Sequence, residues 1–150
     1  MKFLPSPTPK ISVTLDEGVA VVSLDNVAKH NALDLSMWRA LPEIIAAIAD
    51  DEEARVVVLR GVGESPFASG ADIAEFETVR ADAQGGRAYE GANEDAFAAL
   101  ALCPKPVIAM IRRFCMGGGV GIAAACDLRI AAEGTLFAVP AARLGVGYPP

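Results

Sequence analysis

Three short runs of apolar, largely β-branched residues constrain the fold of this 150-residue chain more than any other feature. They are Val19–Leu24, Val56–Arg60 and Val107–Ile111. Continuous runs of this length are typical of strands that are covered on both faces, as in a parallel sheet. None approaches the roughly 18 apolar residues of a membrane-spanning helix. We therefore expect buried strands and no membrane partner.

The segment after the first run has the spacing of a helix. It begins after Asp34 or Ser36, either of which can cap a helix. Its apolar residues recur at intervals of three and four positions and predict one buried face: Leu41, Ile44, Ile45 and Ile48. Pro42 is expected in the first turn or at a kink.

Helices and strands alternate along the rest of the chain. Helices are predicted over 73–80, 94–102 and 120–125, and strands over 127–131 and 135–137. Residues 80–92 are interrupted by glycines and are predicted to be a loop or a weak helix. The alternation favours a single α/β domain. We expect a flexible proline-containing leader over 1–10 and a core over 11–150.

Composition excludes several classes of protein. The chain has 13 basic and 19 acidic residues and 53% hydrophobic residues, which excludes intrinsic disorder. It has no basic cluster, so we expect no nucleic-acid partner. Cys103, Cys115 and Cys126 form no Cys-x-x-Cys motif. This pattern favours a reduced cytoplasmic protein without a zinc site.

Two glycine-containing loops are the candidates for chemistry. Phe67–Asp72 follows a predicted strand, and Gly117–Gly119 precedes a predicted helix. Glycine lets a backbone approach a ligand closely, and free N–H groups at a helix start attract negative charge. Two N–H groups that converge on one carbonyl oxygen would form an oxyanion hole. The alternative is two tight turns that serve packing alone.

Four segments together resemble the enoyl-CoA hydratase/isomerase (crotonase) superfamily. They are His30–Leu33, Val56–Gly61, Phe67–Ile73 and Met116–Asp127, in the family's order. The resemblance implies an α/β spiral of repeated β-β-α units that holds an acyl-CoA thioester between the two loops. It implies a role in fatty acid metabolism, with coenzyme A as part of the substrate and no separate cofactor or metal.

The resemblance also implies residue roles. The N–H groups of Ala71 and Gly118 would donate to the thioester oxygen, as catalytic groups that stabilise an enolate. The substrate-binding positions would be Lys29, His30, Ala32, Ala71, Asp72, Ile73, Ala74, Gly117 and Gly118. The resemblance also implies a homo-oligomer, a trimer or hexamer, if the full-length chain is present. The family's C-terminal helical part is expected to be absent, which would leave apolar surface exposed.

Two positions depart from the hydratases of this family. Their two water-activating glutamates correspond to Gly121 and Ala141, so hydration is not expected. The segment from Phe137 to Tyr148 resembles that of methylmalonyl-CoA decarboxylase, in which a tyrosine corresponds to Tyr148. The alternatives are therefore a decarboxylase that uses Tyr148 and a catalytically silent acyl-CoA binder or assembly subunit.

A dinucleotide-binding domain is a further alternative. Gly119–Ala124 fits the pattern Gly-x-Gly-x-x-Ala. However, Arg112–Gly118 separate these glycines from the preceding strand, where the motif requires a tight turn. No acidic residue follows about 20 positions later to bind a ribose hydroxyl. Both features count against this interpretation.

Overall fold

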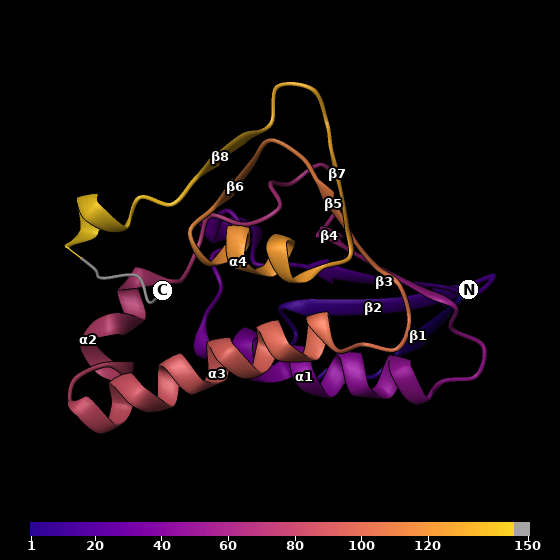
Figure 1. Cartoon of the computed structure of the whole chain (residues 1–150), viewed down its shortest axis with the longest axis horizontal. Coiled ribbons are helices and arrows are strands. Elements are labelled where there is room, and N and C mark those ends of the chain that lie inside the picture. Colours follow the sequence, from indigo (N-terminus) through magenta and orange to yellow (C-terminus); the bar gives the residue numbers. More distant parts are fainter. Residues whose placement is uncertain (146–150) are drawn as a thin grey trace.

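A mixed α/β fold with two sheets organises the chain (Figure 1). The computed structural model describes residues 1–145. The strands are β1 (Lys2–Leu4), β2 (Ile11–Asp16), β3 (Val19–Leu24), β4 (Val56–Gly61), β5 (Val107–Ile111), β6 (Phe114–Met116), β7 (Leu128–Ala131) and β8 (Leu136–Ala138). The α-helices are α1 (Leu35–Asp50), α2 (Phe76–Val79), α3 (Ala83–Ala101) and α4 (Gly118–Ala125), and the 3-10 helices are η1 (Val27–Lys29), η2 (Ile73–Glu75) and η3 (Ala141–Leu144).

The larger sheet has the order β1-β2-β3-β4-β5-β7, and β6 pairs with β8 in the smaller sheet. β1, β2 and β3 pair antiparallel, whereas β3, β4, β5 and β7 are parallel neighbours. After β4 the chain passes through α2 and α3, then through β5, β6 and α4, and then through β7, β8 and η3. Each turn adds one strand to the parallel sheet. This arrangement confirms the predicted α/β class and its winding of strands and helices.

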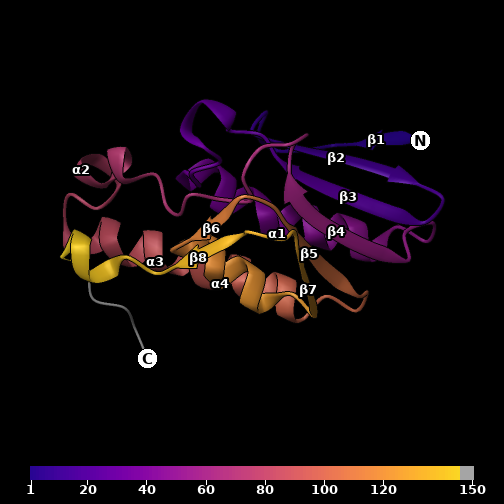
Figure 2. The same cartoon turned by 90° about the horizontal axis from the view of Figure 1, so that it is seen from above.

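The core lies between the larger sheet and the helices α1 and α3, which lie behind the strands in Figure 2 and run side by side in Figure 1. The buried face of α1 contains all of its predicted apolar positions, and also Met37, Trp38 and Ala40. Each large apolar side chain buried there contributes about 1.5–3 kcal/mol. Asp34 is the cap, since its carboxylate accepts the Met37 N–H at 2.9 Å. Pro42 lies inside the helix and not in its first turn, so of the two predicted alternatives only a kink stays a prediction.

Of residues 80–92, predicted to be a loop or a weak helix, residues 83–92 form the first half of α3. The Asp82 carboxylate caps this helix by accepting the Gly85 N–H at 2.7 Å. One face of α3 is buried through Tyr89, Ala92, Ala96 and Leu100. Because tertiary packing outweighs the low helix propensity of glycine, the helix persists through its three glycines.

The predicted leader contains β1, which pairs with β2 in the register Lys2 to Leu15. The Lys2 ammonium also forms ion pairs with Asp51 and Glu53. β2 itself was not predicted, although Ile11, Val13 and Leu15 alternate with polar residues and are buried. The division into a leader and a core stays a prediction.

The strands β7 and β8 present apolar side chains to solvent. Their large exposed residues and the residue that follows are Leu128, Ile130, Leu136, Phe137 and Val139, with exposed fractions of 45–64%. Among residues 1–145, no helix combines the length and the apolar character needed to cross a bilayer.

Candidate active site

In the first glycine-containing loop, the backbone N–H of Ala71 points away from the neighbouring residue Leu33. Ala71 forms a parallel bridge with Leu33. The Leu33 N–H donates to the Gly70 carbonyl, and the Asp72 N–H donates to the Leu33 carbonyl, both at 2.8 Å. These two bonds flank Ala71, so its own N–H points away from Leu33. Within residues 1–145 this N–H has no hydrogen-bond acceptor.

The second loop ends at the start of α4. Gly117 has φ +50° and donates its N–H to the Ala138 carbonyl at 2.8 Å. Gly118 is the first residue of α4, where N–H groups have no partner within the helix. A Cβ at Gly118 would lie 2.8 Å from Cζ2 of Trp38, so only glycine fits under the indole.

The two loops touch at their glycines. Gly70 has φ +105°, and a Cβ at Gly117 would lie 3.6 Å from Cα of Gly70. A Cβ at Gly118 would lie 3.8 Å from the nitrogen of Ala71. The N–H groups of Ala71 and Gly118 therefore start from neighbouring backbone segments on one cavity. This arrangement allows both to donate to one oxygen.

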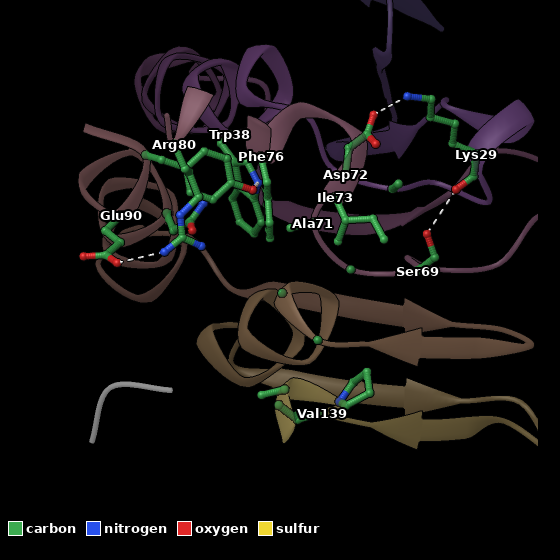
Figure 3. A pocket seen from close by; sticks show the side chains of 18 of the residues that line it. Lys29, Trp38, Ser69, Ala71, Asp72, Ile73, Phe76, Arg80, Glu90 and Val139 are labelled. Carbon is green, nitrogen blue, oxygen red and sulfur yellow. Dashed lines mark hydrogen bonds and ion pairs between the residues drawn. The ribbon is translucent and has the colours of Figure 1, made fainter. Parts of the chain in front are cut away.

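The cavity has a volume of about 810 Å³ and lies between the two loops, α3 and the segment after β8 (Figure 3). Most of the residues predicted to bind substrate line it: Lys29, Ala32, Ala71, Asp72, Ile73, Gly117 and Gly118. His30 and Ala74 do not. His30 is exposed and meets the Phe114 ring edge-on, with ring centroids 6.0 Å apart. Tyr148 lies outside the described residues.

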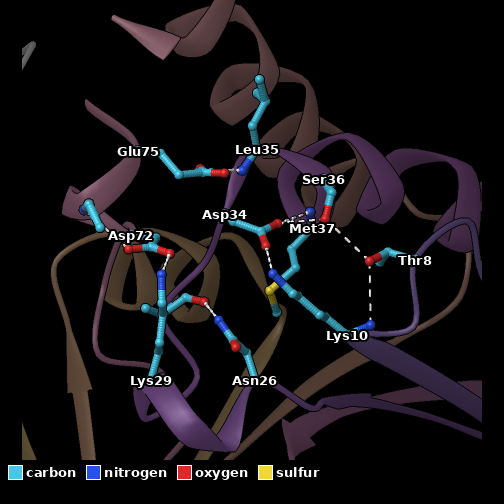
Figure 4. Close-up of polar contacts among 12 residues, drawn as sticks. Thr8, Lys10, Asn26, Lys29, Asp34, Leu35, Ser36, Met37, Asp72 and Glu75 are labelled. Carbon is cyan, nitrogen blue, oxygen red and sulfur yellow. Dashed lines mark hydrogen bonds and ion pairs between the residues drawn. The ribbon is translucent and has the colours of Figure 1, made fainter. Parts of the chain in front are cut away.

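An ion pair joins η1 to the first glycine-containing loop (Figure 4). The half-exposed Lys29 ammonium lies 2.5 Å from the buried carboxylate of Asp72. Asp72 also accepts the Ala74 N–H at 3.2 Å and so caps η2. The Ser69 hydroxyl donates to the Lys29 carbonyl at 3.0 Å. These contacts fix η1 against the loop that carries Ala71.

Aromatic side chains that the sequence analysis missed form one wall of the cavity. Trp38 packs edge-on against Phe97 at 5.6 Å between centroids, and Phe76 against Tyr89 at 5.7 Å. The Trp38 Nε1–H donates to the Tyr89 hydroxyl oxygen at 3.1 Å. Burial raises the pKa of the Tyr89 phenol, and the hydrogen bond from Trp38 offsets only part of that effect.

Phe97 occupies the space beside position 121. A Cβ at Gly121 would lie 2.6 Å from Cζ of Phe97. Ala141 lines the cavity and carries no ionisable group. The carboxylates on the cavity wall are Asp72, Glu90 and Glu94. Asp72 pairs with Lys29 and Glu90 with Arg80, so neither is a free acid within residues 1–145.

Two residues near the loops have structural roles. Glu75 accepts the Leu35 N–H at 2.9 Å at the start of α1 (Figure 4). Cys115 next to the second loop is buried, and burial raises the pKa of its thiol to about 12. Such a thiol is not a nucleophile at neutral pH.

Comparison with known families decides the classification. Residues 14–149 match the family model described as enoyl-CoA hydratase/isomerase. The chain belongs to the enoyl-CoA hydratase/isomerase family. The match includes both glycine-containing loops, so Ala71 and Gly118 lie within the matched segment.

Relatives in this family carry several activities by name. The chain is 37% identical over 128 residues to a short-chain-enoyl-CoA hydratase of Clostridium acetobutylicum, covering 85% of this chain and 48% of the relative. It is 32% identical over 134 residues to the mouse mitochondrial Delta(3,5)-Delta(2,4)-dienoyl-CoA isomerase, and the match covers 83% of this chain and 41% of the relative. The crystal structure of an enoyl-CoA hydratase/carnithine racemase from Magnetospirillum magneticum superposes with a TM-score of 0.92 at 39% identity. The superposition covers 97% of this chain and 54% of that protein's chain. The chain thus spans about half the length of these relatives.

Proposed function

We propose that this chain binds an acyl-CoA thioester and stabilises its enolate form through the N–H groups of Ala71 and Gly118. The observation that carries the proposal is the meeting of the two loops, which brings to one cavity two N–H donors that have no acceptor within residues 1–145. An enolate bears negative charge on the former carbonyl oxygen, and fixed donors stabilise that charge without reorganisation. The thioester is the substrate, and the proposal requires no other cofactor.

Water addition by a pair of glutamates is not part of the proposal. A glutamate at position 121 would collide with Phe97, and position 141 is alanine. Enolate chemistry without a glutamate pair includes decarboxylation, in which the C–C bond to the carboxylate breaks, carbon dioxide leaves, and the electron pair of that bond forms the enolate. Decarboxylation with Tyr148 is the second candidate, supported by the sequence resemblance alone. A silent acyl-CoA binder is the third.

The first test asks whether the carbonyl oxygen contributes to binding. We expect butyryl-CoA to bind about 3–10-fold more tightly than S-butyl-CoA, which lacks the carbonyl oxygen, because a hydrogen bond contributes about 0.5–1.5 kcal/mol. Ala71→Pro, which removes one donor, should reduce this preference, and Ala71→Ser, which keeps the N–H, should not. Titration calorimetry measures both. Equal binding of the two ligands by the unchanged protein would contradict the proposal.

The second test separates enolate stabilisation from hydration. Crotonyl-CoA incubated with the protein should show no gain of water by mass spectrometry. A gain of water would show that acids other than the two missing glutamates perform hydration. A malonyl-type thioester tested alongside would lose carbon dioxide if the decarboxylase alternative holds.

A further inference from the structure

We infer that the α3 wall of the cavity selects an acyl group that carries a second carboxylate, with Arg80 as the specificity-determining residue. The inference deepens the proposed function and rests on it, since it concerns the acyl part of the same acyl-CoA. The ligand class is the monothioester of a dicarboxylic acid. Three groups on this wall support it: the Arg80 guanidinium, the Asn93 amide and the Tyr89 hydroxyl.

Arg80 is held in place by the aromatic wall. Its Cζ lies 5.1 Å from the centroid of the Phe76 ring and 5.6 Å from that of Tyr89, within the range of a cation–π contact. The side chain is only 28% exposed and lines the cavity. Figure 3 shows the guanidinium beside the aromatic rings, with a dashed line that marks its contact with Glu90. Two aromatic contacts fix the orientation of a planar donor group before any ligand binds.

Most donors of this guanidinium are unused. Arg80 makes one side-chain hydrogen bond within residues 1–145, from one terminal nitrogen to Glu90 at 3.2 Å. A guanidinium carries five N–H donors in a fixed fork that matches the two oxygens of a carboxylate. Arg80 lines a largely apolar cavity, where a charged hydrogen bond is stronger than in water.

Two more donors lie on the same wall. Nδ2 of Asn93 is buried and makes no hydrogen bond with any described residue, although the amide lies beside the Tyr89 hydroxyl. The Tyr89 oxygen accepts from Trp38, and its own proton has no acceptor within residues 1–145. A buried donor without a partner is costly, and a ligand oxygen removes that cost. All three groups donate, so they favour a ligand group that is rich in acceptors.

The acidic neighbours of Arg80 oppose an anionic ligand. Glu90 pairs with Arg80 and is 62% exposed, and Glu94, one turn further along α3, is exposed. Water and salt screen charges at such positions, whereas a bidentate contact with Arg80 is direct. The Lys29–Asp72 pair is neutral as a unit. The attraction of Arg80 for a carboxylate therefore outweighs the repulsion by Glu90 and Glu94. We expect removal of the charge of Glu90 to strengthen binding of a dicarboxylic ligand.

The test compares two ligands of equal chain length, glutaryl-CoA and pentanoyl-CoA, by titration calorimetry. We expect the unchanged protein to prefer glutaryl-CoA. Arg80→Gln should lower the affinity for glutaryl-CoA at least about 10-fold, as for the loss of other hydrogen bonds to charged groups. It should change the affinity for pentanoyl-CoA less than about twofold. Arg87→Gln is the matched control, because Arg87 is exposed on α3 and does not line the cavity. Glu90→Gln should strengthen glutaryl-CoA binding only.

Three results would overturn the inference. One is equal affinity of the unchanged protein for the two ligands. The second is an equal loss of glutaryl-CoA binding in Arg80→Gln and Arg87→Gln, which indicates general electrostatics. The third is an Arg80→Gln variant that binds neither glutaryl-CoA nor pentanoyl-CoA while its circular dichroism spectrum is unchanged, which indicates a structural role for Arg80. Failure of the unchanged protein to bind either thioester would instead refute the proposed function, and this inference with it.

Discussion

Single residues determine whether the two N–H donors can meet. Gly70 and Gly117 both adopt positive φ angles, which a side chain would strain, and their backbones are in contact. Gly118 lies under Trp38 with no room for a Cβ. The glycines are therefore required by geometry on both sides of the contact. This is why a sequence that shows only two glycine-containing loops already indicates where the site lies.

Asp34 links stability to pH at the start of α1. Burial opposes its charged form, but hydrogen bonds from Lys10, Ser36 and Met37 outweigh burial and hold the pKa of Asp34 below its usual range. A depressed pKa stabilises the fold above the ordinary carboxyl pKa, and that stabilisation is lost as the pH falls through the folded-state value. Asp34→Ala should lower the free energy of unfolding at neutral pH by about 0.5–2 kcal/mol through the lost cap alone.

Urea denaturation at neutral and acidic pH checks this prediction. Asp34→Asn keeps a capping oxygen but no charge, so its deficit relative to the unchanged protein should shrink as the pH falls below about 4. Asp50→Ala, at the other end of α1, is the control and should change stability little. A deficit of Asp34→Asn that is independent of pH would refute the linkage.

At the scale of elements, α3 provides one wall of the cavity. Its glycines differ in surroundings: a Cβ at Gly86 meets nothing within 4 Å, whereas a Cβ at Gly85 would lie 2.7 Å from the Val79 carbonyl oxygen. Gly86→Ala should therefore raise the free energy of unfolding by about 0.5–1 kcal/mol. Gly85→Ala should lower it. Thermal unfolding of the two variants provides a matched pair, and the same sign for both would contradict the assigned helix.

The same helix shows where sequence-based prediction stops. The apolar runs predicted β3, β4 and β5, and the glycine-containing loops predicted the backbone of the site, because both depend on local patterns. The aromatic wall was missed because its residues come from α1, α2 and α3 and meet only through tertiary packing. Tyr89, Asn93 and Phe97 recur every four residues, a helical signal that the nearby glycines obscured.

At the scale of the whole molecule, β7 and β8 expose several large apolar side chains. Exposed apolar side chains in such number are a feature of interaction surfaces. We expect the chain to self-associate, with a mass above the 15.6 kDa of one chain in light scattering. Ile130→Ser should reduce association, whereas Val27→Ser, at an exposed site on η1, should not. A monodisperse monomer at high protein concentration would contradict this expectation.

The central claim is that the Ala71 and Gly118 N–H groups polarise a thioester carbonyl. The most direct test is the infrared difference spectrum of bound butyryl-CoA labelled with carbon-13 at that carbonyl. Two hydrogen bonds weaken a C=O bond, so the account predicts that the carbonyl band shifts to lower frequency on binding, with a smaller shift in Ala71→Pro. A bound thioester whose carbonyl band stays at its frequency in water, or a shift of equal size in Ala71→Pro, would contradict the account.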